Sequence, residues 1–185
     1  LYAHHVFPDT AEINKCGHLM LGGCDTTELA SNFGTPLYIY DEQTLRDRCR
    51  SFNETFKHIY PETLVAYASK AYINPALASI IHQEGLGLDV VSGGELAVAQ
   101  ASNFSPANVY FHGNNKGKEE LEQALRWGIG RIVIDNFHEI ELLEELAAHI
   151  GNNQKILLRV SPGIDPHTHS KTTTGTLDSK FGFPI

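Results

Sequence analysis

The sequence predicts an α/β fold in which short strands and amphipathic helices alternate to build a parallel sheet. From residue 64 onward, apolar or β-branched runs alternate with stretches whose apolar residues recur at helical spacing. This is the pattern of repeated βα units, and it continues for four units and a fifth strand. A chain of 185 residues with 42% hydrophobic and 19% charged residues is also typical of a globular protein with a real core.

The first sixty residues precede this alternation. Residues 1–30 contain a helix start at Thr26 and are expected to form a separate small element. Residues 36–40 are predicted as a strand because they combine aromatic and β-branched side chains. Asp41 then caps a predicted helix that continues towards Tyr60.

The first two βα units follow. An apolar run over residues 64–71 predicts a buried strand, and the helix over 75–84 begins at Pro75, which suits the first helical turn. The second unit combines a strand over 86–91 with a helix over 95–101.

Two more units and a last strand complete the alternation. A strand over 108–112 precedes a helix over 118–127, and a strand over 131–135 precedes a helix over 140–150. The helices are acidic or polar outside and apolar on one face, which predicts that each packs on the sheet. Residues 156–160 predict the fifth strand.

Composition excludes several classes of function. The formal charge of −8 with scattered basic residues argues against a nucleic-acid surface or attraction to anionic lipid. No apolar stretch approaches the roughly 20 residues that span a bilayer. Cys16, Cys24 and Cys49 show no C-x-x-C spacing, so neither a disulfide framework nor a thiolate zinc site is predicted. We therefore expect a cytoplasmic protein that acts on small molecules.

Polar residues gather where the predicted strands end. In βα architectures the carboxyl ends of the strands form the functional face. Five polar strand ends aimed at one rim therefore predict a ligand site. They are Lys70 and the residues at 92–95, 112–116, 135–136 and 159–163.

Lys70 has two interpretations. A lysine on a buried strand that loses its proton through desolvation becomes a nucleophile suited to a Schiff base. Alternatively, Lys70 closes the strand and its ammonium group reaches solvent.

Other motifs carry weaker predictions. Residues 93–94, both glycine, open a helix whose free N–H groups could bind an anion, or they form a tight turn. Residues 85–90 lack the third glycine of a dinucleotide fingerprint, and residues 113–118 have the wrong spacing for a P-loop. His167 and His169 invite a metal hypothesis, but they have no third ligand, and no metal is expected.

Several motifs, taken in order, resemble a known family. On these motifs the chain is similar to the diaminopimelate decarboxylases, which are fold-type III, alanine-racemase-like enzymes that use pyridoxal phosphate (PLP). The motifs occupy residues 67–72, 87–96, 111–116, 159–163, 167–169, 174–175 and 179–182.

The resemblance implies an incomplete (β/α)₈ barrel of the TIM type. Residues 41–185 would form about half of the eight units, which bind PLP. Residues 1–40 would form an N-terminal segment with a strand that belongs with a β domain. The rest of the barrel and the C-terminal β domain would be absent, so the chain is expected to be an N-terminal fragment.

The resemblance also implies roles for five residues. Lys70 would hold PLP as a Schiff base and later transfer a proton. Asp89, His112 and Arg159 would lie near the cofactor, and Ala68 would touch its ring. Asp89 as a helix cap and Arg159 as part of a surface ion pair remain alternatives.

The implied function is PLP-dependent decarboxylation of meso-diaminopimelate to lysine, in lysine biosynthesis, by a homodimer of the intact parent. The fragment alone is expected to be inactive and prone to self-association through its open barrel edge. Four alternatives stay open. They are a fold-type III decarboxylase of arginine, ornithine or carboxynorspermidine, a racemase, a PLP-free lysine aldolase, and a non-catalytic PLP-binding protein.

Overall fold

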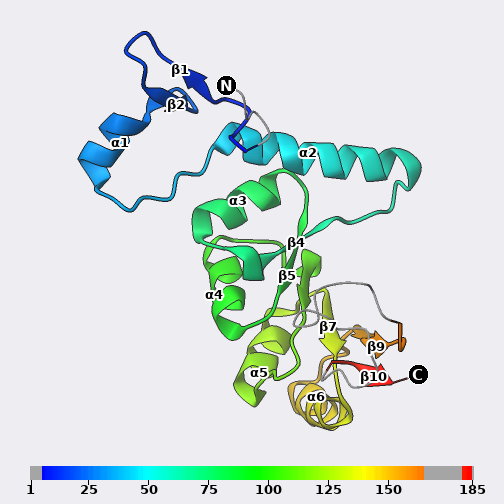
Figure 1. Cartoon of the computed structure of the whole chain (residues 1–185). Helices are drawn as coiled ribbons and strands as arrows, with labels where there is room; N and C mark the ends of the chain where they lie inside the picture. Colours follow the sequence, from blue (N-terminus) through cyan, green and yellow to red (C-terminus); the bar gives the residue numbers. More distant parts are fainter. Residues whose placement is uncertain (1–5, 165–180, 185) are drawn as a thin grey trace. The chain divides into compact units, whose positions relative to one another are not determined.

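The computed structural model describes residues 6–164 and 181–184. Contacts within the chain divide it into two compact units, residues 1–63 and residues 64–185. Each unit has its own sheet, and each is described by itself (Figure 1).

The N-terminal unit contains a small antiparallel sheet and two helices. Both predicted helix starts are confirmed. The side chain of Asp25 accepts from the N–H of Thr27, and the side chain of Asp41 accepts from the N–H of Thr44. Such caps satisfy N–H groups that lack a partner within the helix. The elements are β1 (Glu12–Ile13), β2 (Leu19–Leu21), β3 (Cys24–Asp25), α1 (Thr26–Phe33) and α2 (Glu42–Ile59).

The strand predicted at residues 36–40 is wrong. The segment is irregular and pairs with none of the described strands. A strand needs a neighbouring backbone to pair with, and aromatic composition alone does not supply one. Pro36 also lacks the N–H that a ladder uses. Tyr38 and Tyr40 are accordingly exposed, Tyr38 to 88%. The assignment of residues 1–40 to a β domain remains a prediction.

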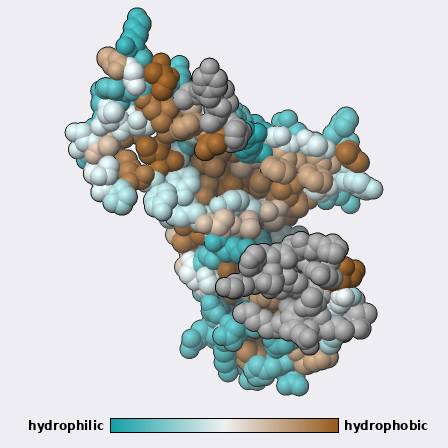
Figure 2. Space-filling model, viewed as in Figure 1, coloured by the Kyte–Doolittle hydropathy of each residue, from teal (hydrophilic) through white to brown (hydrophobic). Residues whose placement is uncertain are grey.

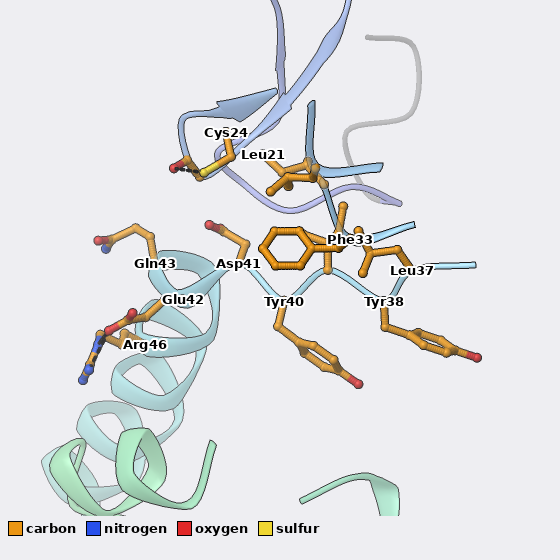
Figure 3. Close-up of a pocket in the computed structure, with 13 residues that line it drawn as sticks. Leu21, Cys24, Phe33, Leu37, Tyr38, Tyr40, Asp41, Glu42, Gln43 and Arg46 are labelled. Atoms are coloured by element: carbon orange, nitrogen blue, oxygen red, sulfur yellow. Dashed lines mark hydrogen bonds and ion pairs between the residues drawn. The ribbon is translucent and has the colours of Figure 1, made fainter. Parts of the chain in front are cut away.

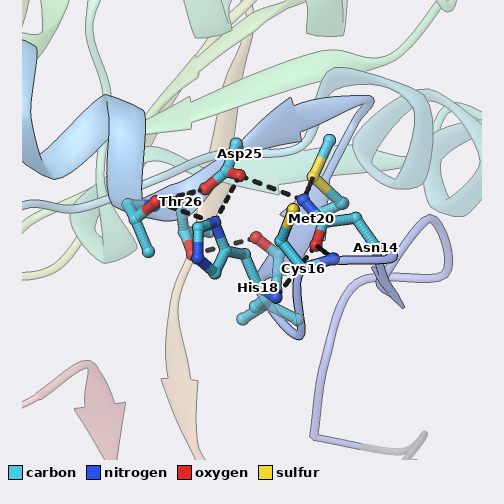
Figure 4. A network of polar contacts seen from close by, with 8 residues as sticks. Asn14, Cys16, His18, Met20, Asp25 and Thr26 are labelled. Atoms are coloured by element: carbon cyan, nitrogen blue, oxygen red, sulfur yellow. Dashed lines mark hydrogen bonds and ion pairs between the residues drawn. The ribbon is translucent and has the colours of Figure 1, made fainter.

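A polar network centred on Asp25 joins the small sheet to helix α1 (Figure 4). One carboxylate oxygen lies 2.8 Å from Nδ1 of His18 and accepts from the amide of Asn14 at 3.1 Å. The other accepts from the hydroxyl and the N–H of Thr27. The Thr27 hydroxyl, followed by His18, holds the pKa of Asp25 well below its usual range. This carboxylate therefore remains ionised and keeps the network together in mild acid.

The C-terminal unit confirms the predicted βα units. Its five-stranded sheet has the order β4-β5-β6-β7-β8, all neighbours are parallel, and each strand lies beside the strand before it in the chain. Helices α3 to α6 follow one another along one side of the strands (Figure 1). This is the arrangement of a partial βα barrel. The elements are β4 (Ala66–Ala68), α3 (Pro75–Gln83), β5 (Gly87–Val90), α4 (Gly93–Ala101), β6 (Val109–Phe111), α5 (Lys118–Trp127), β7 (Arg131–Ile134), α6 (Phe137–Ile150) and β8 (Ile156–Leu158).

The core lies between the sheet and its helices. Side chains alternate between the two faces of a strand, so Leu88 and Val90 on β5 share one face while Asp89 between them points to the other. Leu88 and Val90 are fully buried, as is Phe111 on β6. The opposite face of the sheet carries Asp89 beside Ala68 of β4, to which it is paired in register. This face leads to the predicted ligand rim.

The first and last strands of the sheet differ from the buried strands between them. The strand predicted over residues 64–71 is wrong in length and burial, because β4 spans three residues at one edge and Lys70 lies on a following 3₁₀ turn (Ser69–Ala71), where it is exposed. At the other edge, the side chains of β8 are exposed by 44% to 56%. Beyond it, β9 (Val160–Ser161) pairs in parallel with β10 (Phe183–Pro184). Edge position, rather than local composition, decides the burial of both strands.

Two glycines that follow helix α5 differ in how closely neighbouring backbone approaches them. A Cβ on Gly130 would lie 2.1 Å from the carbonyl oxygen of Ala107, whereas a Cβ on Gly128 would meet nothing within 4 Å. We expect Gly130→Ala to lower the free energy of unfolding by about 3 kcal/mol through overpacking against backbone. Gly128→Ala is the control, and it should cost only about 1 kcal/mol for the left-handed φ of Gly128. Urea unfolding measures both, and equal losses would contradict the close approach.

Candidate active site

A cavity of about 530 Å³ lies at the carboxyl ends of the strands of the C-terminal unit. It brings together Lys70, Asp89, His112 and Arg159, four of the five residues expected at the site. Ala68 is outside the lining, although it lies beside Asp89 in the sheet. The complete lining consists of Lys70, Asp89, Val91, His112, Gly113, Asn114, Asn115, Arg159 and Phe181.

Asp89 and His112 form a close pair across two neighbouring strands. Asp89 lies on β5, and His112 directly follows β6. The N–H of His112 donates to the carbonyl of Val90 at 2.8 Å, which extends the strand pairing to the histidine. Nδ1 of His112 then contacts Oδ1 of Asp89. Asp89 therefore orients an imidazole, and the helix-cap alternative is wrong, because the side chain of Ser92 caps α4.

Arg159 is held from two sides. Its guanidinium donates to the carboxylate of Asp135 at 3.1 Å and lies 4.2 Å from the ring centre of Phe181. Asp135 is only 3% exposed, so this is not the surface ion pair considered as an alternative. A cation fixed by a buried carboxylate and an aromatic face keeps its charge at one place in the cavity wall.

Glu95 is a titratable group near the cavity that was not among the expected site residues. Its carboxylate accepts from the N–H of Val91 at 2.9 Å. Burial raises the pKa of Glu95 and the charge of Asp89 raises it further, while the Val91 hydrogen bond and the charge of Lys70 act in the opposite direction. Glu95 belongs to the polar strand end at residues 92–95, which was the signal available in the sequence.

The glycines at 93–94 do not leave a fully free helix N-terminus. The N–H of Gly93 donates to the carboxylate of Glu120 at 2.6 Å, and the other oxygen of Glu120 accepts from the N–H of Gly117. One carboxylate thus serves the starts of α4 and α5 together. The anion-site alternative therefore has no support at the N–H of Gly93.

Comparison with known proteins identifies the family. The family described as "Pyridoxal-dependent decarboxylase, pyridoxal binding domain" matches residues 42–185, which is most of the chain. The chain belongs to the pyridoxal-dependent decarboxylases. Its five-stranded βα sheet and the cavity at the strand ends therefore form part of a pyridoxal-binding domain.

Two similar members of this family are named diaminopimelate decarboxylase. The chain is 49% identical to the diaminopimelate decarboxylase of Bacillus methanolicus, over 97% of this chain and 41% of the relative. It is also 49% identical to that of Bacillus subtilis, over 95% of this chain and 40% of the relative. The chain thus spans about two fifths of the length of these curated relatives.

A solved structure agrees with the fold. The diaminopimelate decarboxylase of M. jannaschii, crystallised in complex with L-lysine, matches with a TM-score of 0.85 and 38% identity. The match covers 96% of this chain and 42% of that structure. The partial barrel is therefore the fold of this decarboxylase family, as the sequence predicted.

The raised pKa of Glu95 predicts how the free energy of unfolding varies with pH. The folded chain binds a proton at Glu95 more tightly than the unfolded chain does, so this carboxyl group's contribution to stability falls as pH rises above the ordinary value of 4.5. Glu95→Gln removes the titration. We expect the stability of this variant relative to the wild type to increase with pH across that window, as measured by urea unfolding at a series of pH values.

Glu119→Gln is the control for this measurement, because Glu119 is exposed on α5 and its replacement removes the same charge. Its stability relative to the wild type should change less with pH. If the stability of Glu95→Gln relative to the wild type does not change with pH, the assigned upward shift of the Glu95 pKa is contradicted.

A larger cavity, of about 690 Å³, lies in the N-terminal unit, and none of the expected site residues lines it. Figure 3 shows Leu21, Phe33 and Leu37 grouped together, with Tyr38 and Tyr40 projecting away from them. Brown, hydrophobic surface also gathers over this unit in Figure 2. Apolar side chains dominate its lining, which contains no lysine or histidine, so it offers none of the amine or imidazole groups predicted for the site.

The described residues show neither a metal-binding cluster nor a membrane-spanning helix. Within residues 6–164 and 181–184, no group of three or more histidine, cysteine, aspartate or glutamate side chains could hold a metal ion. His167 and His169 lie outside the described residues. None of the described helices is long and apolar enough to cross a membrane.

Proposed function

We propose that the full-length protein decarboxylates meso-diaminopimelate to lysine with PLP bound at the 530 Å³ cavity. One observation carries the proposal: the amine of Lys70 shares this cavity with the Asp89–His112 pair and with Arg159. The 49% identity to diaminopimelate decarboxylases supports the choice of substrate.

The residues around the cavity fit PLP. A primary amine suits an aldehyde, and the amine of Lys70 lies at the cavity wall. Ala68, paired in register with Asp89, adds only a small methyl side chain beside it. The cavity volume is in the range that holds small-molecule ligands. When bound, PLP supplies an electron sink for the electron pair that is released as carbon dioxide leaves.

Lys70 would perform two tasks. Its amine would hold the cofactor covalently. When it is not bound to the cofactor, the same amine would move a proton at the substrate carbon that loses its carboxylate. Because Lys70 is exposed, the described residues do not provide the desolvation expected from a buried strand.

The other three cavity residues would orient the imidazole and balance the charge of the substrate. Asp89 fixes the imidazole of His112, so that the ring presents one face and one nitrogen to the cavity. Arg159, held by Asp135, keeps a positive charge in the cavity lining. Such a charge attracts the carboxylates of an amino acid substrate.

We also propose a homodimer in the cytoplasm for the full-length protein. The cysteines support a reducing compartment, since Cys16 and Cys24 are exposed and none of the three forms a disulfide. Sedimentation of the full-length protein tests the dimer.

The experiment that tests the proposed function uses the full-length protein with PLP. We expect a visible absorbance band from lysine-bound PLP, and borohydride should abolish it. Carbon dioxide should be released from meso-diaminopimelate at least about a hundredfold faster than from arginine or ornithine. A band without carbon dioxide release would favour a PLP-binding protein, and absence of the band would favour the aldolase.

A further inference from the structure

Lys116 is a buried cation directly behind the candidate active site. Its side chain is 0% exposed, and it is the only lysine or arginine that is buried among the described residues. Lysine is rarely buried unless it is paired. Its Nζ lies 2.7 Å from the carboxylate of Glu139, which is also buried.

The ammonium group of Lys116 also binds two backbone carbonyls. It donates to Gly113 at 2.6 Å and to Val133 at 2.8 Å. Val133 belongs to strand β7, whereas Gly113 lines the cavity and directly follows His112. One side chain therefore connects the rigid sheet to the 112–115 loop, which supplies four of the residues in the cavity wall.

The backbone of this loop has little freedom at Gly113. Its φ of +120° favours glycine, and a Cβ there would lie 3.2 Å from the carbonyl oxygen of Val91 and 3.5 Å from Cγ of Lys116. The loop thus packs between the end of β5 and the aliphatic part of Lys116. Removal of the Nζ contact frees the carbonyl that fixes this packing.

The same cluster also reaches Arg159, a second part of the cavity lining. The second carboxylate oxygen of Glu139 accepts from the N–H of Asp135 at 3.0 Å. The side chain of Asp135 in turn binds Arg159. The His112 side and the Arg159 side of the cavity therefore share one buried anchor.

A buried ion pair is a poor source of stability, because desolvation of the two charges offsets their attraction. Apolar side chains of similar size would stabilise the fold at least as well. The conformational specificity that such a pair provides is the better account of its place behind the cavity.

We propose that Lys116 is a positioning residue, which with Glu139 fixes the 112–115 loop so that the Asp89–His112 pair keeps one geometry at the cavity. The proposal rests on the proposed function for its kinetic consequence. Its structural consequence, a loop immobilised by Lys116, is independent of any activity.

The test compares four forms of the full-length protein. Lys116→Met removes the ammonium group but leaves Glu139 as an unpaired buried charge. The double variant Lys116→Met/Glu139→Gln removes both charges. Ile81→Ala is the matched control, since Ile81 is buried on α3, an element separate from residues 112–117, and its truncation leaves a cavity in the core. The wild type completes the set.

Amide hydrogen exchange in the cofactor-free protein is the first measurement. We expect both Lys116 variants to exchange at least about tenfold faster than the wild type at residues 112–117. Ile81→Ala should lower the thermal midpoint without this local increase. Wild-type exchange rates in the double variant would overturn the proposal.

Kinetics with PLP and meso-diaminopimelate is the second measurement. Glu139→Gln in the double variant should restore most of the thermal midpoint lost in Lys116→Met, but kcat should stay about tenfold or more below the wild type. Recovery of kcat together with the midpoint would reduce Lys116 to a structural role and overturn the proposal. A wild type that releases no carbon dioxide would refute the proposed function, while the exchange data would still decide the role of Lys116.

Discussion

Replacement of Lys70 by alanine in the full-length protein is expected to lower kcat for meso-diaminopimelate by about a thousandfold or more. The variant loses the amine that holds the cofactor and the group that moves a proton, and removal of a nucleophile that acts within a unit has effects of this order. The borohydride-sensitive absorbance band should disappear at the same time. The fold should remain, because Lys70 is an exposed residue on a 3₁₀ turn.

Lys118→Ala is the matched control for the loss of a lysine. Its ammonium group lies 3.9 Å from Glu145 on the exposed surface, and its side chain is 60% exposed. We expect kcat within about twofold of the wild type, since exposed ion pairs contribute little. A Lys70→Ala variant that retains more than about a tenth of wild-type kcat would refute the assigned role.

Residues 1–185 expressed alone are expected to release no measurable carbon dioxide from meso-diaminopimelate. The chain spans 41% of the Bacillus methanolicus relative, and its partial barrel leaves strand β8 at an exposed edge of the sheet. An unpaired edge with apolar side chains is a template for pairing with another chain. We therefore also expect concentration-dependent association, which sedimentation velocity measures.

The full-length protein assayed beside this fragment is the control. A fragment that decarboxylates the substrate at a rate comparable with the full-length protein would show that the site is complete within residues 1–185. A fragment that remains monomeric at high concentration would contradict the expected pairing at the β8 edge.

Local signals predicted the helices well. The predicted bounds of α5 at residues 118–127 match the structure because Leu121, Ala124 and Leu125 occupy one face and Gly128 ends the helix in the left-handed conformation. Strands were harder, since their extent depends on partners. β4 is shorter and less buried than the apolar run over 64–71 suggested, because it lies at the edge of the sheet.

The candidate site was predicted in outline only. The sequence and the resemblance singled out Lys70, Asp89, His112 and Arg159 as separate positions, and these four line one cavity. The contacts among them could not be predicted from local pattern. Asp89 and His112 are 23 residues apart, and they meet because the parallel register pairs Val90 with Phe111.

The carboxylate of Glu120 at the start of α4 has a consequence for cofactor choice. Helix N-termini commonly attract phosphate, but here a side chain of the same chain already accepts from the N–H of Gly93. A phosphate group would have to displace that negative charge to reach this N–H. The N–H of Gly93 therefore offers no means of discriminating pyridoxal phosphate from the unphosphorylated vitamin, and selectivity for the ester must rest on other groups of the protein.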